Sequence, residues 1–183
     1  MNDRDRSTVP VPEVTQPVVR LIEAWEDTPA LVLGSCLDIL AANALGRALY
    51  QLALPYGNLV RFTFVDPAAR VFYRDWQDIA EAGVAWLRST GGSRARDARL
   101  TEIVDELASH EEFQRLWGRY EVHGKASDVK RLHHPVVGDL TLRYQIFDVG
   151  QAVGQYLFTY QPDPASPGEK ALAELRAVAA AQA

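Results

Sequence analysis

The sequence predicts an α+β domain, in which a five-stranded antiparallel sheet has helices packed on one face. The chain has 183 residues, of which 48% are hydrophobic and 23% charged, an average composition for one soluble domain with its own core. Two short apolar runs lie within residues 30–42, helical spacing dominates from there to about residue 117, and a period of two marks residues 127–161. Two strands before a block of helices and three strands after it can join in a single sheet, so we expect that arrangement.

The first predicted helix and strands follow a polar N-terminal segment. Residues 1–12 are charged and then rich in proline, with nothing to bury, so we expect a disordered leader followed by a domain over residues 13–180. Apolar residues at helical spacing predict an amphipathic helix over residues 18–25. The two apolar runs of residues 30–42 predict a strand pair. Asn43 is then a natural N-cap for the next helix, because its side chain can accept from free N–H groups.

Asp66 and Pro67 give the strongest local signal in the helical block. Aspartate caps a helix, and proline fits the first helical position. The apolar residues that follow predict one long helix over residues 67–90 that ends at a pair of glycines. Two shorter helices are expected over residues 100–107 and 113–117.

Alternating hydrophobicity marks the strands of the second half. Glycine-containing turn signals at residues 138–139 and 150–154 divide this half into three parts. The expected antiparallel strands are residues 127–136, 139–148 and 154–161. A last helix is expected over residues 168–180.

Composition excludes several classes of function. Nineteen basic residues against 24 acidic ones give a net charge of −5, which disfavours nucleic-acid binding over a broad face. The single cysteine, Cys36, can form neither an internal disulfide nor a cysteine-based zinc site. His133 and His134 are adjacent on a strand and must point to opposite faces, so we expect no metal and no cofactor. No apolar run approaches the ~18 residues of a membrane span, and we expect a cytoplasmic protein without a signal peptide.

Large aromatic side chains crowd the predicted long helix, the short helix and the last two strands. Plain core packing explains each of them singly, but together they can leave a mostly apolar pocket with a few polar anchors. The expected ligand-binding residues are Phe72, Trp76, Leu116, Trp117, Tyr120, Arg131, His134, Leu142, Tyr144 and Phe158. A buried anionic head group would need a basic partner, and strand parity leaves open which residue supplies it. The candidates are Lys130, Arg131, His133, His134 and Arg143.

Several stretches resemble a known family. The longest of them are residues 27–34 (DTPALVLG), 37–43 (LDILAAN), 64–70 (FVDPAAR) and 129–142 (VKRLHHPVVGDLTL), and shorter ones are residues 58–61, 75–76, 84–88 and 113–117. In this order they resemble the ligand-binding domain of MmyB-like (also called MltR-like) transcription regulators, which are XRE-type helix-turn-helix proteins. The resemblance extends over about residues 17–175. It implies a PAS-like fold that binds a small apolar ligand, with a fatty acid as the best-matching class.

The chain also departs from that family. Ala42 stands where the family commonly has tryptophan, and Ser35 and Cys36 stand where it commonly has arginines. In such regulators a DNA-binding half precedes this domain, whereas here too few residues precede the first helix to form a helix-turn-helix. We therefore expect either a piece of a longer regulator or a protein that has lost its DNA-binding half.

The leading functional expectation is a small-molecule-sensing domain of a bacterial transcription regulator, and not an enzyme. Its ligand would modulate dimerisation or DNA binding; the partners would be a second copy of the chain, and DNA only through a helix-turn-helix domain outside this sequence. One alternative is a ligand-free dimerisation or interaction module. Another is a small hydrolase or isomerase in which Asp66 or Asp139 acts with His134.

Overall fold

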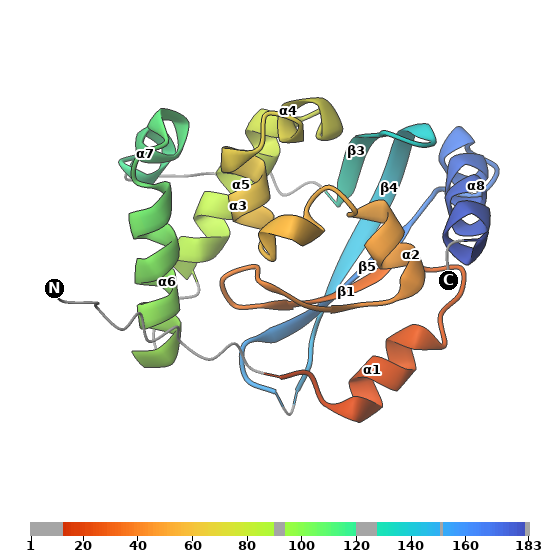
Figure 1. The fold of residues 1–183 in the computed structure, drawn as a ribbon, viewed down its shortest axis with the longest axis horizontal. Helices are drawn as coiled ribbons and strands as arrows, with labels where there is room; N and C mark the ends of the chain where they lie inside the picture. Colours follow the sequence, from red (N-terminus) through yellow and green to blue (C-terminus); the bar gives the residue numbers. More distant parts are fainter. Residues whose placement is uncertain (1–12, 90–93, 120–127, 151, 182–183) are drawn as a thin grey trace, which may run out of the picture.

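The computed structural model describes residues 13–89, 94–119, 128–150 and 152–181 (Figure 1). The expected leader over residues 1–12 lies outside this part. The strands are β1 (Ala30–Gly34), β2 (Ile39–Ala42), β3 (Val129–His134), β4 (Gly138–Asp148) and β5 (Gln155–Gln161). The helices are α1 (Gln16–Glu23), α2 (Ala44–Leu49), the 3-10 turn η1 (Leu54–Tyr56), α3 (Leu59–Val65), α4 (Ala69–Phe72), α5 (Trp76–Ser89), α6 (Arg94–Leu107), α7 (Glu111–Trp117) and α8 (Pro167–Ala181).

The five strands form one antiparallel sheet in the order β2-β1-β5-β4-β3. The first two strands meet the last three where β1 pairs with β5, with Leu31 opposite Phe158. The longest connection between strands runs from β2 to β3 and contains all the central helices (Figure 1). The pairing of β1 with β5 brings the two ends of this connection into one sheet. The predicted α+β class and five-stranded antiparallel sheet are confirmed.

The sheet has helices on both faces, and in this it differs from the expectation of one covered face. The main core lies between the sheet and the central helices, and it includes Leu31 of β1 and Phe158 of β5. On the other face, Ile22 of α1 packs with Val32 and Leu157 in a smaller cluster. Figure 1 shows α1 on the side of the sheet opposite α2 and α3. Strand β1 is buried on both faces, so its second apolar face needs the cover that α1 provides.

The predicted long helix over residues 67–90 is wrong in one respect, because it is divided into α4 and α5. Tyr73 is extended at the division and forms an isolated β-bridge with Leu132. The backbone N–H of Arg74 also donates to the carbonyl of Arg131, 3.0 Å away. These contacts with strand β3 take the place of helical hydrogen bonds, so a long-range interaction interrupts a helical sequence pattern. The predicted cap is also wrong, because α4 begins only at Ala69 and its N-cap residue is Ala68; Asp66 ends α3, and its Oδ1 accepts from the N–H of Ala68 at 2.8 Å in the turn between the two helices.

Asn43 caps α2 as predicted and also ties three elements together. Its Oδ1 accepts from the N–H of Gly46 at 2.8 Å and from the N–H of Ala30 at 3.0 Å. Its amide nitrogen faces the carbonyls of Ile22 and Trp25 at the end of α1, at 3.1 and 2.9 Å. The side chain is almost fully buried, so these hydrogen bonds satisfy a polar group that would otherwise be costly to bury.

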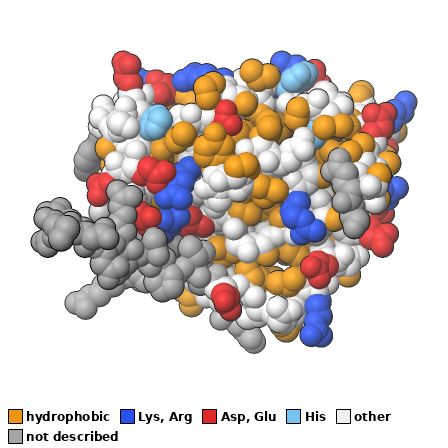
Figure 2. Space-filling model, in the orientation of Figure 1, with side chains coloured by type: hydrophobic (Ala, Val, Ile, Leu, Met, Phe, Trp, Pro, Cys, Tyr) orange, Lys and Arg blue, Asp and Glu red, His pale blue; other side chains and the backbone are white. Residues whose placement is uncertain are grey.

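Within the described residues, no helix is long and apolar enough to cross a membrane. On the face of the molecule seen in Figure 2, hydrophobic and uncharged atoms predominate in the middle, while most acidic and basic side chains lie toward the margins.

Candidate ligand-binding site

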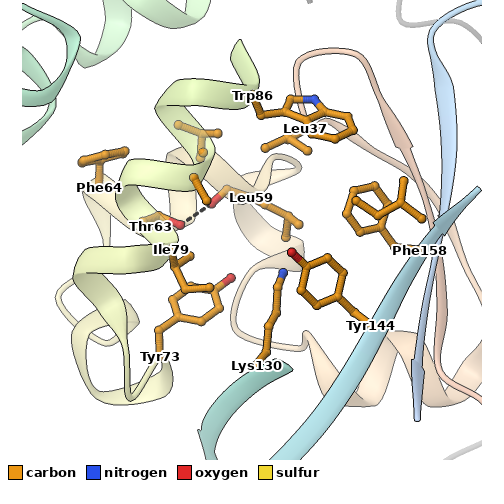
Figure 3. A pocket seen from close by; sticks show the side chains of 14 residues that line it. Leu37, Leu59, Thr63, Phe64, Tyr73, Ile79, Trp86, Lys130, Tyr144 and Phe158 are labelled. Atoms are coloured by element: carbon orange, nitrogen blue, oxygen red, sulfur yellow. Dashed lines mark hydrogen bonds between the residues drawn. The ribbon is translucent and has the colours of Figure 1, made fainter. Parts of the chain in front are cut away.

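A cavity of about 100 Å³ lies between the sheet and helices α3 and α5 (Figure 3). Most of its wall is apolar, and the polar atoms come from hydroxyl groups and one amine. The lining residues are Leu37, Leu59, Val60, Thr63, Phe64, Tyr73, Ile79, Ala82, Gly83, Trp86, Lys130, Tyr144, Ile146 and Phe158. A mostly apolar pocket with a few polar groups is the usual form of a small-molecule site.

Helix α5 forms one wall of the cavity with Ile79, Gly83 and Trp86. Their spacing of four and three residues places them on one face of the helix. Gly83 keeps the space open, because a Cβ at this position would contact only the Val60 side chain, at 3.7 Å. The opposite wall comes from Tyr144 and other alternate residues of the strands, which share the face of the sheet that α5 covers.

Trp86 joins α5 to the turn between β1 and β2. Its indole Nε1 donates to the backbone carbonyl of Ser35 at 3.0 Å. The ring packs edge-to-face against Tyr156 and Phe158 of β5, with centroids 5.0 and 5.9 Å apart. The helix is therefore held to the sheet by both a directional hydrogen bond and aromatic contact.

The same turn contributes Leu37 to the cavity wall in an unusual backbone conformation. Leu37 has φ 65°, in the left-handed region that non-glycine residues rarely adopt. The next residue, Asp38, is buried and accepts from Arg99 Nη2 of α6 at 2.5 Å and from Asn58 Nδ2 at 3.0 Å. This ion pair and hydrogen bond fix the turn and so fix the position of Leu37.

Lys130 is the basic residue that the fold places in the cavity. Its Nζ lies 4.8 Å from the ring centroid of Tyr144 and 5.6 Å from that of Tyr160. Figure 3 shows the amine pointing into the cavity between Tyr73 and Tyr144. Burial lowers the pKa of Lys130 to about 8, since no acidic group among the described residues offsets the loss of solvent. The aromatic faces compensate only part of this loss.

The neighbouring tyrosines stay protonated and carry no negative charge at neutral pH. Tyr50 donates its hydroxyl hydrogen to Tyr160, with the oxygens 3.0 Å apart. Burial raises the pKa of Tyr50, Tyr73, Tyr144 and Tyr160. The cavity and its surroundings therefore present hydroxyl groups and one amine to a ligand.

A smaller cavity of about 50 Å³ adjoins the first and shares Ile79, Ala82, Lys130 and Tyr144 with it. Lys130 and Tyr144 thus stand at the junction between the two cavities. The second cavity is also lined by Asp75, Asp78, Val129 and Arg131. The Nε and Nη2 atoms of Arg131 both donate hydrogen bonds to the carboxylate of Asp75. These hydrogen bonds keep the pKa of Asp75 below its ordinary value.

Two of the ten residues expected to bind ligand line the main cavity, namely Tyr144 and Phe158. Four others belong to the main core but not to the cavity wall, namely Phe72, Trp76, Leu116 and Leu142. Trp76 is nonetheless close, because its Nε1 donates to the carbonyl of Thr63 at 2.9 Å.

The remaining expected residues lie elsewhere. Trp117 is on α7, where it stacks on Phe113 with centroids 5.6 Å apart. The side chain of Arg131 is 60% exposed and lies on the face of β3 opposite Lys130. His134 is buried on the same face as Lys130, but its Nε2 contacts the carbonyl of Ala48 at 3.0 Å, away from the cavity. Tyr120 lies outside the described residues.

The acid–base pairs considered for a hydrolase or isomerase do not form. Asp139 Oδ1 lies 2.7 Å from Nδ1 of His133, not of His134. His134 accepts at Nδ1 from the N–H of Val136 at 3.2 Å, which leaves Nε2 to donate to Ala48. Burial lowers the pKa of His134, in agreement with a neutral ring held between two backbone groups. Asp66 lies in the turn between α3 and α4, where its Oδ1 accepts from the N–H of Ala68.

Two main residues of the cavity wall were not predicted to bind ligand: Lys130 was one of five basic candidates, and Trp86 was not on the expected list. Leu132 indicates the orientation of Lys130, since a buried leucine two residues away on the strand places the lysine on the same face. For Trp86 the signal was its position seven residues after Ile79 on the same helix, close to two full turns. Among the described residues, no group of three side chains is placed to hold a metal ion.

A helix-covered antiparallel sheet that borders a mostly apolar pocket with one amine has the features of a small-molecule-binding domain. Comparison with protein families leads to the same class. The family described as the MmyB-like transcription regulator ligand binding domain matches residues 14–175. This match covers most of the chain, and the chain therefore belongs to the family of MmyB-like transcription regulator ligand binding domains. No curated protein gives a significant match to it.

Proposed function

We propose that this chain is the sensor domain of a bacterial transcription regulator and binds a small apolar acid in the cavity between α5 and the sheet. The observation that carries the proposal is the amine of Lys130, which points into an apolar space without an acidic partner among the described residues. We propose further that the protein is cytoplasmic, acts as a homodimer and has no catalytic activity. The strand order β2-β1-β5-β4-β3 supports the PAS-like fold that the resemblance implies.

A carboxylate ligand would remove an unfavourable feature of the empty site. An ammonium ion that is buried without a counter-charge is destabilised, as the lowered pKa of Lys130 reflects. A carboxylate at this position would form a charge-assisted hydrogen bond, which is about twice as strong as a neutral one. The apolar part of the ligand would then lie against Phe158 and Trp86 and gain ~0.8 kcal/mol for each buried methylene.

The size of the cavity suggests how binding is coupled to regulation. Its volume of about 100 Å³ is below the roughly 300–1,000 Å³ of most sites for drug-sized ligands. A fatty acid, the class expected from the resemblance, would need α5 to move away from the sheet. Such a ligand would bind the expanded arrangement better than the one described here, and this difference in affinity is what shifts a conformational population. The shift in population would in turn change dimerisation of the chain or DNA binding by an attached domain.

The test starts with native mass spectrometry of protein purified without detergent, followed by identification of any molecule released on denaturation. A series of straight-chain carboxylic acids from four to fourteen carbons is then screened by thermal shift. We expect stabilisation that requires the carboxylate and weakens at least tenfold in Lys130→Met. Lys170→Met, which removes an exposed lysine of α8, is the matched control.

The small cavity also favours a second candidate, an interaction module without a ligand. In that case the protein would have a clean apo mass, no acid would shift its melting temperature, and Lys130→Met would leave every binding measurement unchanged. This result would contradict the sensor proposal.

A further inference from the structure

The neutral form of Lys130 suggests a second chemistry for the same cavity. The chain has three lysines, Lys125, Lys130 and Lys170, of which the last two lie in the described part. Lys170 is exposed on α8, whereas Lys130 lines the apolar cavity. An uncharged amine is a nucleophile toward carbonyl carbon, and a desolvated lysine in an apolar pocket is the form that proteins use for this purpose.

Uncharged aromatic side chains surround the amine of Lys130, and they replace the solvent that would stabilise its charged form. Tyr144 of β4 and Tyr160 of β5 present their ring faces, and Tyr73 presents its side chain from the α4–α5 connection. Raised pKa values keep all three hydroxyls uncharged. Two carboxylates, Asp75 and Asp78, line the adjoining cavity, and Asp75 accepts hydrogen bonds from Arg131.

These conditions make the two lysines chemically different. With a pKa of about 8, Lys130 is roughly one-quarter neutral at pH 7.5, whereas an ordinary lysine is about 0.1% neutral. The neutral amine is therefore enriched by about two orders of magnitude at the buried position. Lys170 has its side chain in solvent, where no apolar cavity holds an aldehyde beside it.

We propose that Lys130 captures compact apolar aldehydes as a reversible imine inside this cavity. The amine nitrogen attacks the carbonyl carbon, and the carbinolamine that forms then loses its hydroxyl group and the remaining nitrogen hydrogen as water. The net change is one aldehyde and one amine converted to one imine and one water, with no oxidation or reduction. The inference uses the same cavity as the proposed function but does not require that the cavity bind an acid.

The volume of the site indicates the size of the aldehyde. The cavity of about 100 Å³, together with the adjoining one of about 50 Å³, is comparable to the apolar cavity of ~150 Å³ that holds benzene in another protein. Aromatic side chains such as Phe158 and Tyr144 line this space and suit a ring. Benzaldehyde and hexanal are therefore suitable probes.

The full chain is incubated with benzaldehyde at pH 7.5, and any imine is trapped with sodium cyanoborohydride as a stable secondary amine. Peptide mass spectrometry then compares the rate of benzylation at Lys130 with that at Lys170. We expect Lys130 to react at least tenfold faster and its rate to rise with pH to a plateau, with a midpoint near 8. Equal rates at the two lysines would overturn the proposal.

Two variants test the role of the amine and the role of the cavity separately. Lys130→Arg should lose the fast reaction and keep the slow one at Lys170. Gly83→Leu, which fills the cavity, should reduce benzylation of Lys130 at least fivefold while circular dichroism remains unchanged; an unchanged rate in this variant would contradict capture inside the cavity. Selective benzylation without acid binding would support aldehyde capture and refute the proposed function. Acid binding without selective benzylation would support the proposed function and refute aldehyde capture.

Discussion

The indole Nε1 of Trp86 donates a hydrogen bond to the backbone carbonyl of Ser35 at 3.0 Å and so fastens α5 to the turn between β1 and β2. At the other end of the cavity, the chain just before α5 is fastened to β3 by the hydrogen bond from the N–H of Arg74 to the carbonyl of Arg131. The helix that covers the cavity is thus held at both ends. Expansion of the cavity must break one of these attachments or bend the helix between them.

Trp86→Phe should loosen the first attachment. The change removes the hydrogen bond to Ser35 and some aromatic contact, and we expect it to lower the free energy of unfolding by about 1–3 kcal/mol in urea titrations. Because α5 would then move more easily, the affinity for a ten-carbon acid should rise about two- to fivefold, while that for a four-carbon acid stays constant. Trp117→Phe on α7 is the control. A loss of affinity for both acids would contradict this role of Trp86.

Lys130 should give the stability of the protein a characteristic dependence on pH. Its folded-state pKa of about 8 is below the ordinary 10.5, so between these values the unfolded chain binds more protons and stability rises with pH. We expect an increase on the order of 1–2 kcal/mol between pH 7 and 9.5. Above pH 10 the trend reverses, because buried Tyr50 and Tyr160 have raised pKa values and the unfolded chain loses these protons first.

Lys130→Met tests this assignment. The variant replaces a buried amine with an apolar side chain, so it should be more stable than the parent at pH 7 by on the order of 1–3 kcal/mol and lack the rise toward pH 9.5. Urea unfolding at a series of pH values measures both effects, with Lys170→Met as control. The same pH slope in parent and Lys130→Met would show that another group is responsible.

Two helical glycines should respond to alanine in opposite directions. A Cβ on Gly46 of α2 would lie 2.4 Å from the carbonyl oxygen of Ala30, so Gly46→Ala forces α2 away from β1 and should cost about 3 kcal/mol. At Gly83 the nearest atom is 3.7 Å away, and Gly83→Ala should stabilise the protein by up to about 1 kcal/mol. Chemical unfolding of both variants checks the pair, and similar destabilisation of the two would be inconsistent with the described packing.

The ion pair between Asp38 and Arg99 should matter more than exposed pairs. Both side chains are largely buried, at 9% and 15% exposure. Asp38→Ala leaves the guanidinium of Arg99 without its main partner and should cost about 3–5 kcal/mol, with little effect of salt. Asp128→Ala, which removes an exposed partner of Arg143, should change stability by less than about 1 kcal/mol. Equal effects of the two substitutions would refute the importance of burial here.

Much of the fold could be predicted from local sequence patterns. Alternating hydrophobicity predicted the strands that became β3, β4 and β5. Asn43 was correctly predicted as a cap, because capping depends only on a short polar side chain next to the first helical turn. The helix predicted over residues 67–90 failed at Tyr73, where a backbone contact with distant Leu132 replaced the local pattern.

By itself, the sequence determined the α+β class, the five strands and the family resemblance, since these depend on periodicity and on motifs within short stretches. Only the tertiary structure decided which basic residue enters the cavity. A shift of one residue along β3 would exchange Lys130 with Arg131, because neighbouring side chains of a strand point to opposite faces. The register of β3 against β4 and the bridge from Tyr73 to Leu132 fix that choice through contacts between residues far apart in the chain.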